Sequence, residues 1–191
     1  MSVTVQFVLG ALGILLFPGP TNTLLAASGA LAGMRKSLRL IPCELVGYLA
    51  AIGLWHQTLR PLIALYPSGP LLSKLLACAY LIYTVIKMYN PSPAACASGS
   101  SVSPWRTFLV TLLNPKAVVF ALLVFDQSKL NIPEFIVFSA LVPCIALLWI
   151  SLGRPLVTAG LIKSPLAISR IAAAILVVFV GLLINSIIEA L

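Results

Sequence analysis

The chain has 191 residues, of which 61% are hydrophobic and only 8% are charged. A soluble domain of this size could not hide that much apolar surface, so the composition excludes a soluble protein and indicates one integral membrane domain of about six spans. The net charge of +8 would suggest a nucleic-acid partner in a soluble protein, whereas here it indicates lysines and arginines gathered at one membrane face.

The first apolar run is interrupted by proline. Residues 1–34 contain no charged side chain and no histidine, and an unbroken helix of that length would far exceed the roughly 30 Å hydrocarbon core of a bilayer. Pro18 and Pro20 flank Gly19, and neither proline fits a regular helix because each lacks an N–H and its ring clashes with the preceding turn. We therefore expect a break at about mid-membrane, where the freed backbone groups must be buried in protein or line a cavity.

Further apolar segments follow along the chain. The expected membrane helices cover residues 3–32, 40–59, 71–88, 105–125, 134–152 and 171–188. The fourth is broken at Asn114, Pro115 and Lys116, as the first is broken at its prolines. Residues 91–104, rich in serine, alanine and proline, are typical of a flexible linker and fall at the midpoint of the chain.

The two halves mirror each other. Pro20 and Pro115 lie almost half a chain length apart, and Pro42-Cys43 in the second span is matched by Pro143-Cys144 in the fifth. Three spans per half is an odd number, so the second half must cross the membrane upside down. The expected fold is thus all-α, with six transmembrane helices in two inverted three-helix repeats (1–90 and 105–191) and with helices 1 and 4 broken at mid-membrane.

The basic residues favour one orientation. With both termini outside, eight fall in cytoplasmic loops, namely Arg35, Lys36, Arg39, Lys87, Arg106, Arg154, Lys163 and Arg170. Three fall in outer loops, namely Arg60, Lys74 and Lys129, and Lys116 belongs to the membrane. The positive-inside rule therefore predicts that the N- and C-termini are both outside the cytoplasm.

The two breaks predict a binding site. Helix ends that point at the midplane offer N–H groups to a carboxylate and carbonyls to an ammonium group, and Asn22 and Asn114 carry amides that donate and accept. Lys116 would hold a substrate carboxylate or neutralise Glu44. The alternatives are a packing kink without a ligand at Pro18 to Asn22, and an offset fourth span from which Lys116 reaches the interface.

Glu44 is the one carboxylate clearly inside an expected span. Burial would favour its protonated form and make it a candidate proton carrier, whereas a nearby Lys116 would favour the carboxylate. The alternative is that Glu44 pairs with Arg39, about 7–8 Å along the helix. His56, beside Trp55, is interpreted as an interfacial anchor in preference to a proton relay.

Two other spacings are suggestive. Tyr80 and Tyr83 share a helix face, so they are candidates to line a pathway, although core packing also explains them. Gly29 and Gly33 have the spacing that lets a neighbouring helix approach closely, which would permit a homodimer.

These residues together resemble the LysE/RhtB family of bacterial amino-acid exporters. The similarity lies in Pro18-Gly19-Pro20 with Asn22, then Gly33 and Arg35-Lys36, in Ala79-Tyr80-Leu81 with Tyr83, and in Asn114-Pro115-Lys116-Ala117 followed by Phe120 and Gln127. The resemblance implies export of amino acids or similar small metabolites across the cytoplasmic (inner) membrane of a bacterium, driven by the proton gradient.

Three functions therefore compete. The leading hypothesis is a secondary exporter that works by alternating access, with an amino acid, protons and the lipid bilayer as partners. The second is a conduit for reducing equivalents through Cys43 and Cys144, and the third is divalent-cation efflux, for which the chain has few ligands. We expect a transporter and not an enzyme, with no catalytic residue, metal, cofactor or nucleic-acid partner.

Overall fold

The computed structural model describes residues 5–66, 68–89, 102–125, 131–158 and 160, with further residues between 173 and 188. All regular secondary structure in these residues is helical. The elements, in chain order, are α1 (Val5–Leu16), α2 (Pro20–Ala32), α3 (Met34–Ser37), α4 (Leu40–Leu65), α5 (Gly69–Tyr89), α7 (Pro104–Leu112), α8 (Pro115–Val119), the π-helical turn η1 (Phe120–Val124) and α9 (Ile132–Thr158). The described residues between 173 and 188 are also helical.

Both predicted breaks are confirmed. The axes of α1 and α2 are bent by 57° relative to each other, and α2 begins with Pro20 as its first residue. The predicted fourth span is divided into α7 and α8, and α8 begins with Pro115 as its first residue. Proline suits this position because the first N–H groups of a helix have no intrahelical acceptor.

Two helical stretches, Met34–Thr58 and Ile132–Leu156, are long and apolar enough to cross a membrane, and the bent pair α1 and α2 would make a third. Lys74–Ile86 is a shorter apolar helix. The predicted all-helical class is therefore confirmed, with two or three helices that could span a membrane. The predicted second span, residues 40–59, ends within one residue of the apolar stretch Met34–Thr58, although the helix α4 itself runs on through Pro61 to Leu65.

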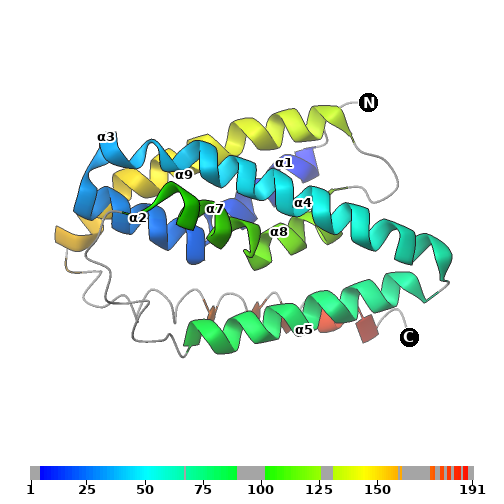
Figure 1. Ribbon diagram of the computed structural model, residues 1–191. Helices are drawn as coiled ribbons and strands as arrows, with labels where there is room; N and C mark the ends of the chain where they lie inside the picture. The colour runs from blue at the N-terminus through cyan, green and yellow to red at the C-terminus, as the bar shows by residue number, and fades with distance from the viewer. Residues whose placement is uncertain are drawn as a thin grey trace.

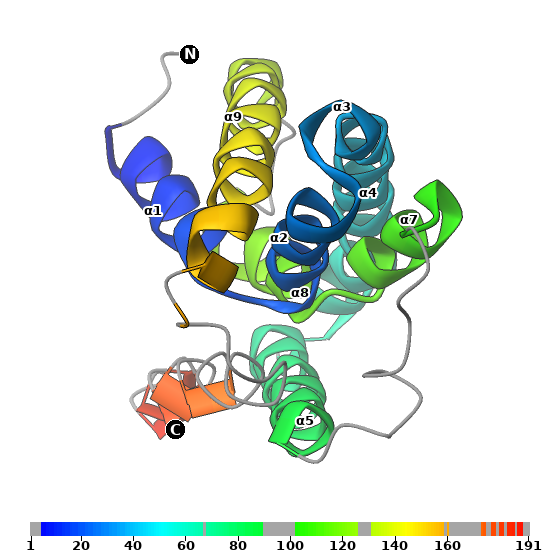
Figure 2. The same cartoon turned by 90° about the vertical axis from the view of Figure 1, so that its left-hand side faces the viewer.

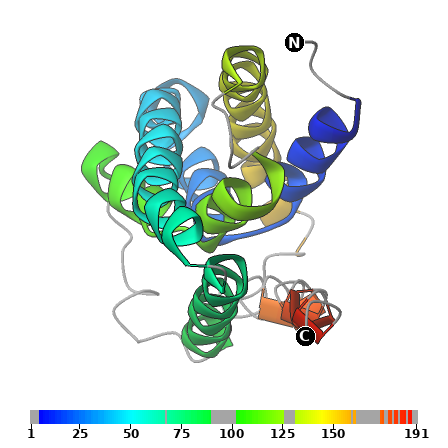
Figure 3. The ribbon, with the colours of Figure 1, turned by 90° about the vertical axis from the view of Figure 1, so that its right-hand side faces the viewer.

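The elements form two layers (Figure 1). Seen from the end that carries α3, α2 lies in the middle of the upper layer, surrounded by α1, α9, α4 and α7, and α5 lies in the lower layer (Figure 2). The opposite end view shows the described C-terminal helical residues beside α5 (Figure 3). Helix α1 begins, and the described C-terminal helical residues finish, at the end of the molecule away from α3.

The main core lies where α1, α4, η1 and α9 meet. Its centre is an aromatic cluster in which the Tyr48 ring lies 6.0 Å from Phe120 and 5.9 Å from Phe138, both edge-on. These edge-to-face contacts between fully buried rings add to the burial of their apolar surface. The cluster joins α4 and α9 through Phe120 of η1.

Glycines bring α2 and α9 into backbone contact. A Cβ atom on Gly29 would lie 2.0 Å from the carbonyl oxygen of Ile150, and one on Gly153 would lie 2.0 Å from that of Ala26. Gly29 therefore packs against α9 of the same chain. Its predicted partner in the close-packing motif, Gly33, has φ +80° at the junction between α2 and α3, with open space around its Cα. The homodimer that these two glycines were expected to permit stays a prediction.

Candidate functional site

The break in the first helix is held by one asparagine. The Asn22 amide donates from Nδ2 to the carbonyl oxygens of Leu15 and Phe17, each at 2.7 Å. Leu15 lies in the last turn of α1 and Phe17 directly follows it, where intrahelical donors run out because the chain turns at Pro18. Asn22 thus satisfies both carbonyls and fixes the direction in which α2 leaves α1.

The second break is held by Asn114. Its Oδ1 accepts from the backbone N–H of Lys116 at 3.0 Å, so Asn114 is the N-cap of α8. On the other side of the break, the Tyr80 hydroxyl from α5 donates to the carbonyl oxygen of Leu113. The backbone groups on each side of the interruption between α7 and α8 therefore have a side-chain hydrogen-bond partner.

The structure brings the two breaks into direct contact. Asn114 Nδ2 donates to Thr21 Oγ1 at 2.7 Å, and the Lys116 ammonium donates to the carbonyl oxygens of Phe17 and, at 3.4 Å, of Leu15. Gly19 makes room for that lysine, because a Cβ atom there would lie 2.9 Å from Lys116 Cε. We call this meeting of residues 15–22 with residues 111–116 the junction.

Helix α4 supplies a carboxylate and a phenol to the junction. Tyr48 Oη accepts from Asn114 Nδ2 at 3.3 Å. Glu44, one turn earlier on α4, is only 2% exposed, and its Oε2 has no hydrogen-bond partner among the described residues. Its charge interacts electrostatically with Lys116, although no direct ion pair joins the two side chains.

Two of the alternatives are wrong. Lys116 does not reach a membrane interface, because it is 4% exposed and bound to carbonyls within the bundle. Glu44 does not pair with Arg39, because Glu44 is buried while Arg39 is exposed and no ion pair joins them. The opposite charges in the junction are therefore Glu44 and Lys116.

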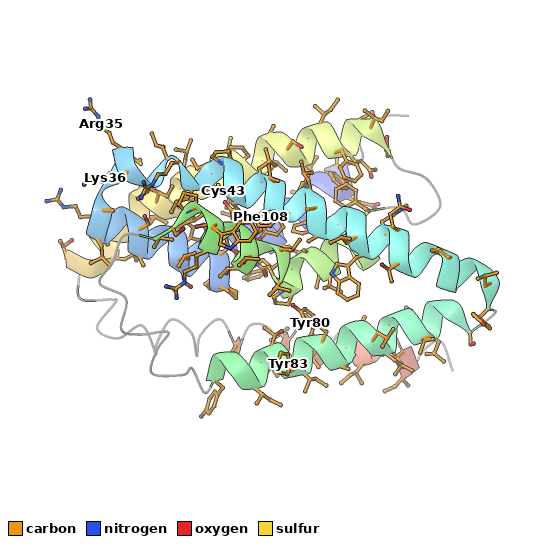
Figure 4. All side chains as sticks on the ribbon, in the orientation of Figure 1. Arg35, Lys36, Cys43, Tyr80, Tyr83 and Phe108 are labelled. Carbon is orange, nitrogen blue, oxygen red and sulfur yellow. The ribbon has the colours of Figure 1, made fainter. Side chains whose placement is uncertain are left out.

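Most of the predicted site residues meet at the junction, namely Pro18, Gly19, Pro20, Asn22, Glu44, Asn114, Pro115 and Lys116. The two tyrosines predicted to line a pathway, Tyr80 and Tyr83, lie in different environments. Tyr80 points from α5 toward the upper layer and reaches the edge of the junction, whereas the Tyr83 side chain is 59% exposed (Figure 4).

Three junction residues were not predicted: Thr21, Tyr48 and Thr111. Thr21 and Thr111 are fully buried, and their hydroxyl oxygens lie 3.4 Å apart across the two broken helices. Sequence signals could have found two of them. Thr111 precedes Asn114 by about one helical turn, and Tyr48 lies four residues after Glu44, on the same face of α4.

Other polar groups lie away from the junction. His56 is 7% exposed and its Nε2 has no partner in the described part of the chain, so its side chain lies inside the bundle; its place at a membrane interface stays a prediction. Cys43, Cys78 and Cys144 are free, and the Cys144 side chain is exposed. In the same residues, no group of three or more His, Cys, Asp or Glu side chains could hold a metal ion.

Comparison of the chain with protein-family models, curated proteins and solved structures gives no match. The resemblance to LysE/RhtB exporters therefore depends on the motif residues alone. The geometry adds that the two motifs of that resemblance, at Pro18 to Asn22 and at Asn114 to Lys116, bind each other.

Proposed function

We propose that the chain is a secondary active exporter of amino acids or closely related small metabolites, driven by the proton gradient and related to the LysE/RhtB exporters. The observation that supports this most strongly is that two broken helices meet through their breaks. Broken helices that meet inside a bundle are the usual construction of a transporter binding site. Here Asn114 and Lys116 of one break bind Thr21 and Phe17 of the other.

The charges suit a zwitterion. In the described arrangement the donors of Asn22, Asn114 and Lys116 are engaged by the protein itself, whereas Glu44 Oε2 has no hydrogen-bond partner. A buried carboxylate oxygen without a donor carries a large desolvation cost. A substrate ammonium or a proton would relieve that cost, so Glu44 is the group through which we expect substrate and proton to compete.

The end of a broken helix can bind the carboxylate of the substrate. The N-terminus of α2 begins at Pro20 in the junction, where the positive end of the helix dipole favours an anion. A substrate carboxylate there would approach Lys116, which neighbours Gly19. The proposed site residues are therefore Pro18, Gly19, Pro20, Asn22, Asn114, Pro115 and Lys116, with Glu44 as the proton-coupling residue.

The proposed topology is six spans in two inverted repeats within a bacterial inner membrane. Large apolar side chains are exposed along every long helix, for example Leu9, Leu54 and Ile136 at 64%, 59% and 64%. Arg35 and Lys36 are exposed at the α3 end, opposite the end at which α1 begins and the described C-terminal helical residues finish (Figure 4). This separation supports N- and C-termini outside the cytoplasm.

The test is efflux from cells preloaded with a panel of labelled amino acids, with and without an uncoupler. Glu44→Gln keeps the side-chain volume and removes the charge, and Glu134→Gln is the matched control, because Glu134 is also buried with an unpartnered Oε2 but lies at the start of α9. We expect uncoupler-sensitive efflux of one or a few substrates, lost in Glu44→Gln and kept in Glu134→Gln. Efflux equal to that of empty cells for every amino acid would contradict the proposal.

A further inference from the structure

The end of α1 forms a small cradle of oxygen atoms. The carbonyl oxygens of Leu15 and Phe17 both face the Asn22 amide and the Lys116 ammonium, so two acceptors are shared by two donors. Leu15 belongs to the last turn of α1 and Phe17 directly follows this helix, so both carbonyls lie at the negative end of its dipole. We call the two carbonyls, together with the Asn22 side chain, the carbonyl cradle.

Lys116 reaches the carbonyl cradle from the other broken helix. Its side chain passes Gly19, where a Cβ atom would lie 2.9 Å from Cε and 3.4 Å from Nζ. The ammonium is buried and no carboxylate of the described residues is in direct contact with it, since Glu44 acts on it only through space. Backbone oxygens therefore take the place that a paired anion occupies around most buried lysines.

We propose that the carbonyl cradle is a monovalent-cation site and that the Lys116 ammonium is its built-in occupant. Carbonyls of unwound helix, and the C-terminal ends of half-helices, are the groups that coordinate coupling cations in transporters. An ammonium group with three N–H donors and a small free cation compete for the same oxygens. The inference goes beyond the exporter proposal and does not depend on which solute the chain moves. It implies that the native protein needs no external Na⁺ or K⁺.

Removing Lys116 should open the carbonyl cradle to free cations. Lys116→Ala leaves the two carbonyls and Gly19 in place, and the Asn22 amide can turn its oxygen toward them, because only hydrogen bonds fix its orientation. Thermal unfolding would be measured for the purified protein in detergent micelles, in chloride salts of Na⁺, K⁺, NH₄⁺ or N-methylglucamine at one ionic strength.

The expected result is specific for small cations. The unfolding temperature of Lys116→Ala should be roughly 3–6 °C higher at about ten times the Kd of the best small cation than in N-methylglucamine. The wild type should unfold at the same temperature in all four salts. Lys116→Met fills the lysine path without a charge and should not respond. Lys36→Ala, at an exposed position on α3, should also behave as the wild type.

Each other outcome is decisive. A folded Lys116→Ala with no cation-specific shift overturns the proposal, and so does an equal shift in the wild type or in Lys116→Met, because the ion would then bind elsewhere. A Lys116→Ala protein that folds only with a small cation supports it, and one that folds in none of the salts overturns it. Because unfolding does not depend on the cargo, a negative result leaves the exporter proposal standing, and absent efflux leaves this one standing.

Discussion

Asn114 connects the two broken helices through both ends of its side-chain amide, and the two ends can be separated by mutation. Oδ1 caps α8 at the N–H of Lys116, whereas Nδ2 donates to Thr21 and Tyr48. Asn114→Ala removes the cap and the bridge. Asn114→Ser keeps a good N-cap residue but is too short to bridge. The difference between these two variants therefore isolates the contribution of the cap.

The magnitudes follow from the contacts. Loss of an N-cap costs about 1 kcal/mol, with a range of about 0.5–2 kcal/mol. Each buried hydrogen bond of the bridge contributes about 1 kcal/mol, and the bond to Tyr48 is the weaker because it is 3.3 Å long. We therefore expect losses in the free energy of unfolding of about 3 kcal/mol for Asn114→Ala and about 2 kcal/mol for Asn114→Ser. At roughly 2–4 °C per kcal/mol, these losses lower the unfolding temperature by about 6–12 °C and 4–8 °C.

A double-mutant cycle with Tyr48→Phe isolates one bond of the bridge. Thermal unfolding in detergent micelles would be followed for the wild type, each single variant and the Asn114→Ser, Tyr48→Phe pair. The cycle should give a coupling energy of about 0.5–1.5 kcal/mol. Purely additive losses would show that Asn114 and Tyr48 do not interact, and wild-type stability of both Asn114 variants would refute the junction as described.

Two further predictions concern the contacts around the junction. Gly29→Ala and Gly153→Ala each place a methyl group 2.0 Å from a backbone carbonyl oxygen, so each should lower the free energy of unfolding by about 3 kcal/mol. Gly13→Ala, with open space around it, should change that free energy by no more than about 1 kcal/mol. Equal effects of the three variants in thermal unfolding would contradict the close crossing of α2 and α9. Tyr80→Phe removes the donor to the last carbonyl of α7 and should cost about 1 kcal/mol, whereas Tyr66→Phe, 57% exposed, should stay within about 0.5 kcal/mol of the wild type.

The positions of both breaks could be predicted from the sequence because the effect of proline is local. Pro18 and Pro20, and likewise Pro115, exclude regular helix whatever surrounds them. Proline alone does not decide where a helix ends, because Pro61 lies inside α4. Packing of a long apolar helix outweighs one missing N–H where the neighbouring turns are held, and local sequence does not report that packing.

The partners at the junction could not be predicted in the same way. The sequence indicates that Lys116 is buried and that its charge must be met, and Glu44 was the evident candidate. The structure instead has the ammonium bound to the backbone oxygens of Leu15 and Phe17, which carry no sequence signal. Gly29 is a similar case, because its spacing predicts a close helix but does not identify Gly153 as the contact.

The two halves of the first broken helix are held by different kinds of contact. α2 is fixed to α9 by steric fit, since at Gly29 and Gly153 the two backbones leave no room even for a methyl group. The end of α1 is held by the donors of Asn22 and Lys116. Such hydrogen bonds can be exchanged for water or ligand at small net cost, whereas close-packed backbones cannot separate without losing their contacts. A rearrangement at the junction would therefore exchange the hydrogen bonds at the end of α1, whereas α2 would stay fixed to α9.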